Sequence, residues 1–142
     1  PLPDLVPVLE RARDIRTQVY DPNGFLGFLR FNHLHAPFND VRVRRAIRDL
    51  LVQPDFMQAV ALPGDWQECH SMFPCSVPGA MEFPPAPRGP QAMERARQSL
   101  RDAGYNGEPI VHINPSDFPA VTQQGRLTVE LMRRLGVNIQ TV

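Results

Sequence analysis

The chain has 142 residues, a formal net charge of zero and no lysine, so all 15 basic charges are arginines. This length fits one modest domain, and 42% hydrophobic with 21% charged residues is typical of a soluble globular protein. The neutral charge gives no global attraction for nucleic acid or an anionic membrane surface, and no apolar run reaches the roughly 20 residues that span a bilayer.

The N-terminal part of the chain predicts one helix and two strands. Apolar residues at helical spacing predict a helix over 3–13. Alternation predicts a short strand over 15–20, and the almost entirely apolar run 25–32 predicts a strand covered on both faces. The turn residues Asp21 to Gly24 between them favour a hairpin, so we expect an antiparallel pair in the sheet.

A helix and a long irregular connection are expected next. Asp40 is a good N-cap, and apolar residues recurring at helical spacing from Val43 predict an amphipathic helix. Pro54 ends this helix or begins another. Residues 62–90 predict a long connection, because six prolines in its last 17 residues leave few backbone donors. Such connections are usually functional or wrap a neighbouring element.

From residue 91 the pattern alternates between helix and strand. The expected elements are helices over 91–103 and 118–135 and strands over 109–114 and 137–142. Gly104 and Gly136 end the helices, and Ser116-Asp117 can cap the second one. Gly125 weakens that helix by about 1 kcal/mol. The order is typical of parallel strands joined by helices. With the expected hairpin, the fold class is α/β, a mixed sheet with flanking helices.

Cys69 and Cys75, with His70 beside the first, lie in the proline-rich connection. A disulfide would staple a segment that has no regular hydrogen bonding, and it would require an oxidising compartment. Two buried free thiols are the alternative, and a reactive or metal-binding pair is a third. We favour the disulfide, because no orienting group or oxyanion hole accompanies the Cys–His pair.

Two other clusters suggest chemistry at first sight. His33 and His35 would share one face of a strand, as metal ligands do, but no neighbouring carboxylate or thiol completes a set, so we expect no metal and no cofactor. The arginines of the helix after Asp40 resemble a nucleic-acid stripe, yet interleaved apolar and acidic residues favour a solvated helix face. Phosphate loops, nucleophile elbows and other enzyme fingerprints are missing from the sequence, so we expect no enzyme.

Three blocks of the sequence resemble one protein family. Residues 31–32 (FN) and 37–47 (PFNDVRVRRAI) are similar to its "F-N … P-F-x-D-x-R-V-R-x-A-I" segment. Residues 96–105 (ARQSLRDAGY) resemble its "A-x-x-L-L-x-x-A-G-Y" helix and turn, and 131–139 (LMRRLGVNI) its "L-x-x-x-G-I-x-V" step. The family is that of the family 5 extracellular solute-binding proteins, the dipeptide, oligopeptide and nickel receptors of ABC importers.

The resemblance implies a two-lobed, non-enzymatic protein that buries its ligand in the cleft between the lobes. Residues 1–142 would be a single α/β fragment of the C-terminal lobe, cut from a longer chain, since the sequence starts without a methionine and ends in a predicted strand. The implied function is the binding of peptides or a similar small solute for import. The alternative is a ligand-sensing regulatory domain built on the same lobe and fused to a signalling or DNA-binding protein.

The resemblance also implies partners, a location and ligand contacts. The partners would be a small solute or peptide and the membrane permease subunits, and no nucleic acid is expected. The location would be periplasmic, with the signal peptide absent from this fragment. We expect the cleft to be lined from loop ends. Asn32 and His33 follow the predicted central strand, while Trp66, Met72 and Phe73 lie in the connection. Aromatic platforms suit peptide or sugar stacking; packing within the lobe is the alternative role for each.

Overall fold

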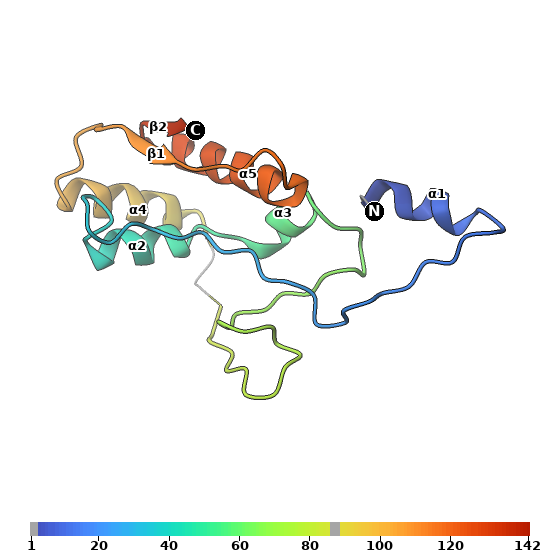
Figure 1. Ribbon diagram of the computed structural model, residues 1–142. Helices are drawn as coiled ribbons and strands as arrows, with labels where there is room; N and C mark the ends of the chain where they lie inside the picture. Colours follow the sequence, from blue (N-terminus) through green and yellow to red (C-terminus); the bar gives the residue numbers. More distant parts are fainter. Residues whose placement is uncertain (1–2, 86–88) are drawn as a thin grey trace.

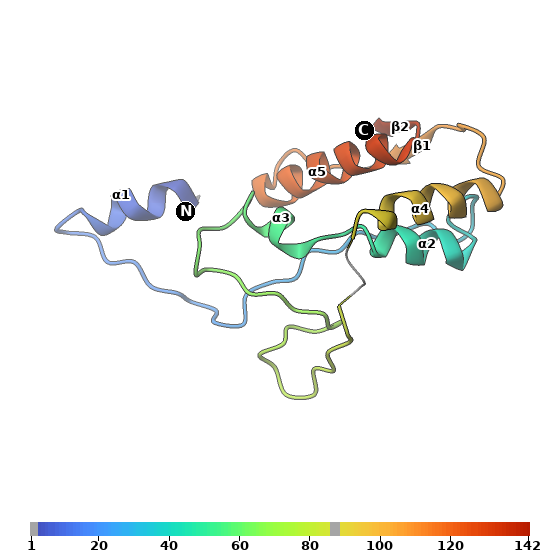
Figure 2. The ribbon, with the colours of Figure 1, turned by 180° about the vertical axis from the view of Figure 1, so that it is seen from behind.

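Helices and one pair of strands make up the regular structure of residues 3–85 and 89–142, which are those that the computed structural model describes. In chain order the elements are a 3₁₀ turn η1 (Pro3–Leu5), α1 (Val6–Glu10), α2 (Val41–Arg48), α3 (Gln53–Met57), α4 (Gln91–Asp102), β1 (Ile110–His112), α5 (Pro119–Leu135) and β2 (Ile139–Thr141). In Figures 1 and 2, α2, α4 and α5 lie together with the strands, while α1 lies apart from them. None of the described helices is both long and apolar enough to cross a bilayer.

Helix α2 forms where its sequence predicts it. The Asp40 side chain caps the helix by accepting a hydrogen bond from the Arg42 backbone N–H at 2.7 Å. Val43 and Ile47 are the most deeply buried large side chains of the chain as described. The helix ends at Arg48, and Pro54 stands in the first turn of the separate helix α3. The cap and the apolar stripe therefore place α2 on the core.

Helices α4 and α5 end at glycines, as predicted. Gly104 has a left-handed φ of 78°, and the next residue, Tyr105, donates its backbone N–H to the Leu100 carbonyl at 3.0 Å. Gly136, with φ of 96°, ends α5 in the same way. The predicted cap by Ser116-Asp117 is wrong, because Phe118 is the N-cap residue and no side chain bonds there. Pro119 occupies the first turn, where its missing N–H leaves no helical bond unmade.

Strands β1 and β2 pair in parallel, and α5 connects them, as the alternation of helix and strand predicts. Ile110 lies opposite Ile139, and His112 opposite Thr141. The core forms where α2, α4 and α5 meet this small sheet. Its members are apolar side chains from these elements and from the segments just before α2 and β2: Phe38, Val43, Ile47, Ala96, Leu100, Val129, Met132, Leu135, Val137 and Ile139. The observed fold is thus α/β, with one two-stranded parallel sheet.

The predicted N-terminal hairpin is wrong. Residues 21–24 do form the expected turn, with the Asn23 N–H donating to the Asp21 side chain at 2.9 Å. Among the described residues, however, 15–20 and 25–32 belong to no strand, so the sheet is not mixed. Alternating and apolar residues favour an extended backbone, but a strand also needs a neighbour that completes its hydrogen bonds. The described structure provides none at this place.

Part of the predicted strand contacts α5 instead. The rings of Phe25 and Phe118 lie 6.0 Å apart between centroids. A Cβ on Gly27 would come within 2.5 Å of the Gln124 side chain, so the backbone passes close to the helix there. The segment thus leads the chain past α5 towards α2.

The long connection is irregular over its described residues, 62–85 and 89–90, as its prolines predict. Residues 86–88 of the predicted span lie outside the described residues. Figures 1 and 2 show the connection leaving the helices in a wide loop before it returns to α4.

Candidate functional site

The connection is fastened at Cys69. A disulfide joins Cys69 to Cys75, with an S–S distance of 2.08 Å, and leaves no free thiol in the chain. The Gln53 side chain, on α3, accepts from the Cys69 N–H and donates to the Cys69 carbonyl, both at 2.7 Å. One amide thus satisfies both backbone groups of a buried residue. The 69–75 loop is therefore tied to the helices at its base.

His70 links further parts of the connection. Its Nε2 lies 3.4 Å from a carboxylate oxygen of Glu68, and its Nδ1 lies 3.4 Å from the Gln53 amide nitrogen. Its carbonyl accepts from the Phe83 N–H at 2.8 Å. With both cysteine sulfurs bonded to each other, this histidine has no thiolate beside it to activate. His70 fixes the course of the loop.

The structure places three of the predicted ligand-contacting residues on this connection. Met72 and Phe73 lie within the disulfide loop, with 69% and 61% of their surfaces exposed. Trp66, three residues before the loop, is half-buried. Exposed apolar side chains on a fastened loop form a surface that a ligand can contact.

The other two predicted residues lie elsewhere, before the start of α2. Asn32 is exposed and accepts a hydrogen bond from the Leu34 N–H at 3.0 Å, which shapes a local turn. His33 is exposed as well. Within residues 3–85 and 89–142, no hydrogen bond or ring contact joins either of them to Trp66, Met72 or Phe73. The fold therefore presents two separate sets of candidate residues.

A metal centre has no support in the described part of the chain. There, no three His, Cys, Asp or Glu side chains come together in a way that could hold an ion. The pair His33 and His35 thus gains no further ligand from the tertiary structure.

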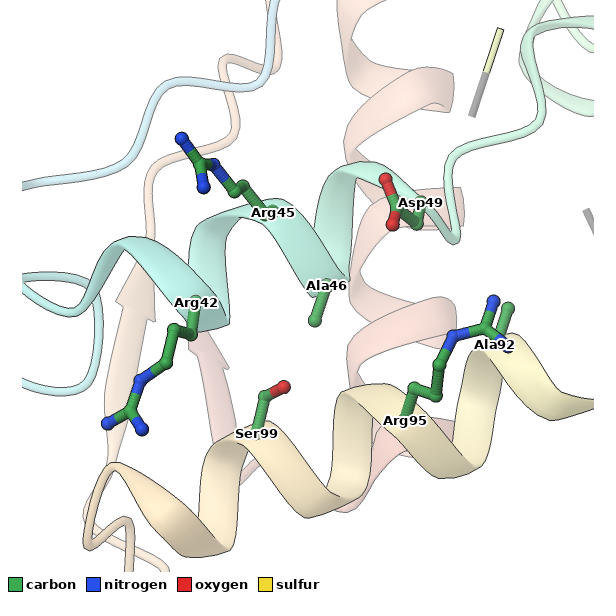
Figure 3. A pocket seen from close by; sticks show the side chains of 7 residues that line it. All are labelled: Arg42, Arg45, Ala46, Asp49, Ala92, Arg95 and Ser99. Carbon is green, nitrogen blue, oxygen red and sulfur yellow. The ribbon is translucent and has the colours of Figure 1, made fainter. Parts of the chain in front are cut away.

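A hollow of about 190 Å³ lies between α2 and α4, where sequence reasoning expects only a solvated face. Figure 3 shows Ala46 and Ser99 pointing towards the space between the two helices, with Arg95 lying along it. The complete lining is Arg42, Arg45, Ala46, Asp49, Ala92, Arg95 and Ser99. Its arginines come from helices about fifty residues apart in sequence, so no local motif could reveal this groove.

The Asp40–Arg42 ion pair lies at one end of the groove. Hydrogen bonds from the guanidinium and from the backbone N–H of Arg42 hold the pKa of the Asp40 carboxyl below its usual value. The same carboxylate raises the pKa of Arg42. The Arg42 side chain is exposed and that of Asp40 is half-buried, so the pair fixes geometry at the helix start more than it adds stability.

Among the described residues, two buried side-chain atoms have no hydrogen-bond partner, one at the end of β1 and one just after it. They are the Nε2 of His112 and the Oδ1 of Asn114. Burial lowers the pKa of His112, because the charged imidazolium loses hydration. The Asn114 amide donates to the Thr122 carbonyl at 3.3 Å and occupies the space where Gly125 would carry a Cβ. Gly125 is therefore needed for this contact between the strand end and α5.

The whole chain, residues 1–142, matches the family model described as "Bacterial extracellular solute-binding proteins, family 5 Middle". It is also similar to a "Probable peptide ABC transporter periplasmic-binding protein y4tO" of Sinorhizobium fredii (strain NBRC 101917 / NGR234), with 28% identity over 143 aligned positions. That alignment covers 96% of this chain and 26% of the relative, so the chain spans about a quarter of the curated relative's length.

Proposed function

Because the chain belongs to the bacterial extracellular solute-binding proteins of family 5, we propose that it forms part of the solute-binding component of an ABC importer. The observation that carries this proposal is the family match over all 142 residues. The proposed solute is a peptide or a similar small polar molecule, which the name of the Sinorhizobium relative supports. The proposed role is binding and delivery, without catalysis.

In this proposal the chain belongs to the C-terminal one of two lobes, with the solute held in the cleft between them. Solute would bridge surfaces that are separate in the open state, and closure would follow a hinge movement. The irregular connection is suited to one wall of such a cleft, because loops on a rigid scaffold commonly carry binding residues.

The disulfide loop is the proposed centre of solute contact in this chain. Met72 and Phe73 expose apolar surface, and the Cys69–Cys75 bond with the Gln53 amide restricts the backbone that carries them. Restricting a loop before binding lowers the entropy lost when ligand orders it. Trp66 would extend this surface. Asn32 and His33 would contribute polar contacts to the solute from the segment that precedes α2.

The disulfide also supports the proposed location. Disulfides persist in oxidising compartments such as the bacterial periplasm and are rare in the cytosol. A periplasmic receptor would deliver its solute to membrane permease subunits, which are the proposed protein partners. The name of the Sinorhizobium relative also describes a periplasmic protein.

Calorimetric titration of the protein at its natural length tests this function. Tripeptides to pentapeptides of defined sequence are the probes, and sugars and nickel complexes are titrated in parallel. We expect saturable, stoichiometric peptide binding. Saturable binding of only a sugar or a nickel complex would overturn the peptide assignment, and binding of none of these probes would overturn the receptor function.

A further inference from the structure

The arginines of α2 and α4 differ in whether they have partners. Arg42 and Arg48 pair with the carboxylates of Asp40 and Asp49, each at 2.6 Å. Arg44 donates to the carbonyls of residues 38 and 39. On α4, Glu94 pairs with two arginines, Arg97 and Arg101. In the described structure, the two that remain without such a partner are Arg45 and Arg95, and both line the α2–α4 groove.

From this arrangement we propose that the α2–α4 groove binds an acidic segment of a protein partner, through the guanidinium groups of Arg45 and Arg95. Their charges come from the two helices that flank the groove, and Ser99 adds a hydroxyl to the lining from α4. Asp49 also lines the groove, but its carboxylate is neutralised by Arg48. The groove therefore carries two uncompensated positive charges.

The chemistry of the groove favours a carboxylate. A guanidinium group binds a carboxylate through two parallel N–H donors. The floor contains the methyl groups of Ala46 and Ala92, against which the methylene groups of a glutamate side chain can pack. A recessed space between two helices also suits a side chain better than a flat lipid surface.

The two arginines can reach an incoming anion because both are exposed. In Figure 3, Arg95 lies along the groove, while Arg45 extends from α2 away from α4. Since Arg45 has no hydrogen-bond or ion-pair partner among the described residues, turning it towards an anion breaks no such bond there. The charge pairs that hold Arg42 and Arg48 would be kept.

The surface is separate from the proposed solute site. Met72 and Phe73 lie on the connection, and none of the proposed solute-contacting residues lines the groove. The two proposals can therefore fail independently.

Fluorescence anisotropy of a labelled hexaglutamate peptide, added to the protein at its natural length, tests the groove. We expect binding that weakens with added salt, and at least about tenfold weaker binding in the double variant Arg45→Gln/Arg95→Gln. The matched control is Arg97→Gln/Arg101→Gln, which removes the same charge from outside the groove and should leave binding within about twofold. Circular dichroism checks that both variants fold.

Three results would overturn the proposal. The first is an equal loss in both double variants, which would indicate a general attraction to positive charge. The second is no loss in the groove variant. The third is tighter groove-dependent binding of inorganic phosphate or of phosphatidylglycerol vesicles than of the peptide. Unchanged solute binding in the groove variant would support the separation of the two sites.

Discussion

The helical body, formed by α2, α4, α5, β1 and β2, and the connection over residues 62–85 are ordered by different forces. The body buries a continuous set of apolar side chains between its elements. The connection has no regular helix or strand and is held by a disulfide, the Gln53 amide and a hydrogen bond to the His70 carbonyl. It points large apolar side chains outwards: Met72, Phe73, Met81 and Phe83.

This difference separates apolar side chains that stabilise the fold from apolar side chains that remain exposed. The body buries a continuous apolar set in its core, whereas the connection exposes large apolar side chains and has no core of its own. A disulfide and a few hydrogen bonds hold the connection in place of apolar burial. Truncating a buried apolar residue of the body should therefore lower the free energy of unfolding, and truncating the exposed apolar residues of the proposed solute site should weaken solute binding.

The largest effect is expected from Ile47→Ala. Ile47 is 1% exposed and packs between the helices, so its truncation should reduce the free energy of unfolding by about 2–5 kcal/mol. Urea denaturation measures this value. The matched control is Ile15→Ala in the N-terminal segment, where the side chain is 41% exposed and the expected change is below about 0.5 kcal/mol. Similar losses in both variants would contradict the assignment of the core.

Removing the disulfide should affect the connection and spare the body. The variant Cys69→Ser/Cys75→Ser no longer closes the 69–75 loop covalently. The expected cost is about 2 kcal/mol in the free energy of local unfolding of the connection. Hydrogen exchange should accelerate at the Cys69 position and in its neighbours while the amides of α4 and α5 keep their protection. An equal loss of protection in α4 and α5 would mean that the two regions unfold as one unit.

Gly125→Ala should destabilise the body although alanine favours helices. The new Cβ would collide with the Asn114 side chain, and the expected cost of such overpacking, about 1–3 kcal/mol, exceeds the gain in helix propensity of about 1 kcal/mol. Thermal unfolding measures the difference. The double variant Asn114→Ala/Gly125→Ala should recover stability relative to Gly125→Ala. A more stable single variant would show that the contact is easily displaced.

The smallest effect is expected from pH. The pKa of His112 is lowered from its ordinary value of 6.5, so the folded state takes up a proton less readily than the unfolded chain. This contribution is present above the ordinary pKa and is lost as the pH falls below it. His112→Phe should flatten the pH dependence of unfolding between neutral and mildly acidic pH. An unchanged pH dependence in His112→Phe would contradict this origin.

Local signals in the sequence predicted much of the fold. Asp40 determines where α2 begins, and Gly104 and Gly136 end α4 and α5 through interactions within a few residues. The strands expected over 15–20 and 25–32 failed because pairing depends on a distant neighbour, which alternation cannot identify. The same holds for Gly125. The sequence predicts that a glycine destabilises the helix, but it does not predict the contact with Asn114 that requires a glycine there.

In the candidate sites, too, features within one segment are predictable from the sequence, whereas contacts between distant segments are not. Cys69 and Cys75 lie six positions apart in one proline-rich segment without regular hydrogen bonding, so the sequence favours a disulfide between them over free thiols. No sequence pattern predicts the hydrogen bonds between the Gln53 amide and the Cys69 backbone, because Gln53 lies on α3, sixteen residues earlier in the chain. That Arg45 and Arg95 line the same groove likewise depends on how α2 packs on α4. Sequence patterns thus predict residues that act within a short segment better than residues that meet across the fold.

Peptide titration of two double variants, in the protein at its natural length, tests the central claim most directly. Met72→Ala/Phe73→Ala removes apolar surface inside the disulfide loop, and Met81→Ala/Phe83→Ala removes side chains of the same types and similar exposure from outside it. We predict at least about tenfold weaker peptide binding for the first variant, since buried aromatic contacts dominate binding, and a change below about twofold for the second. Equal affinities in the two variants would contradict the claim that the fastened loop is where this chain contacts its solute.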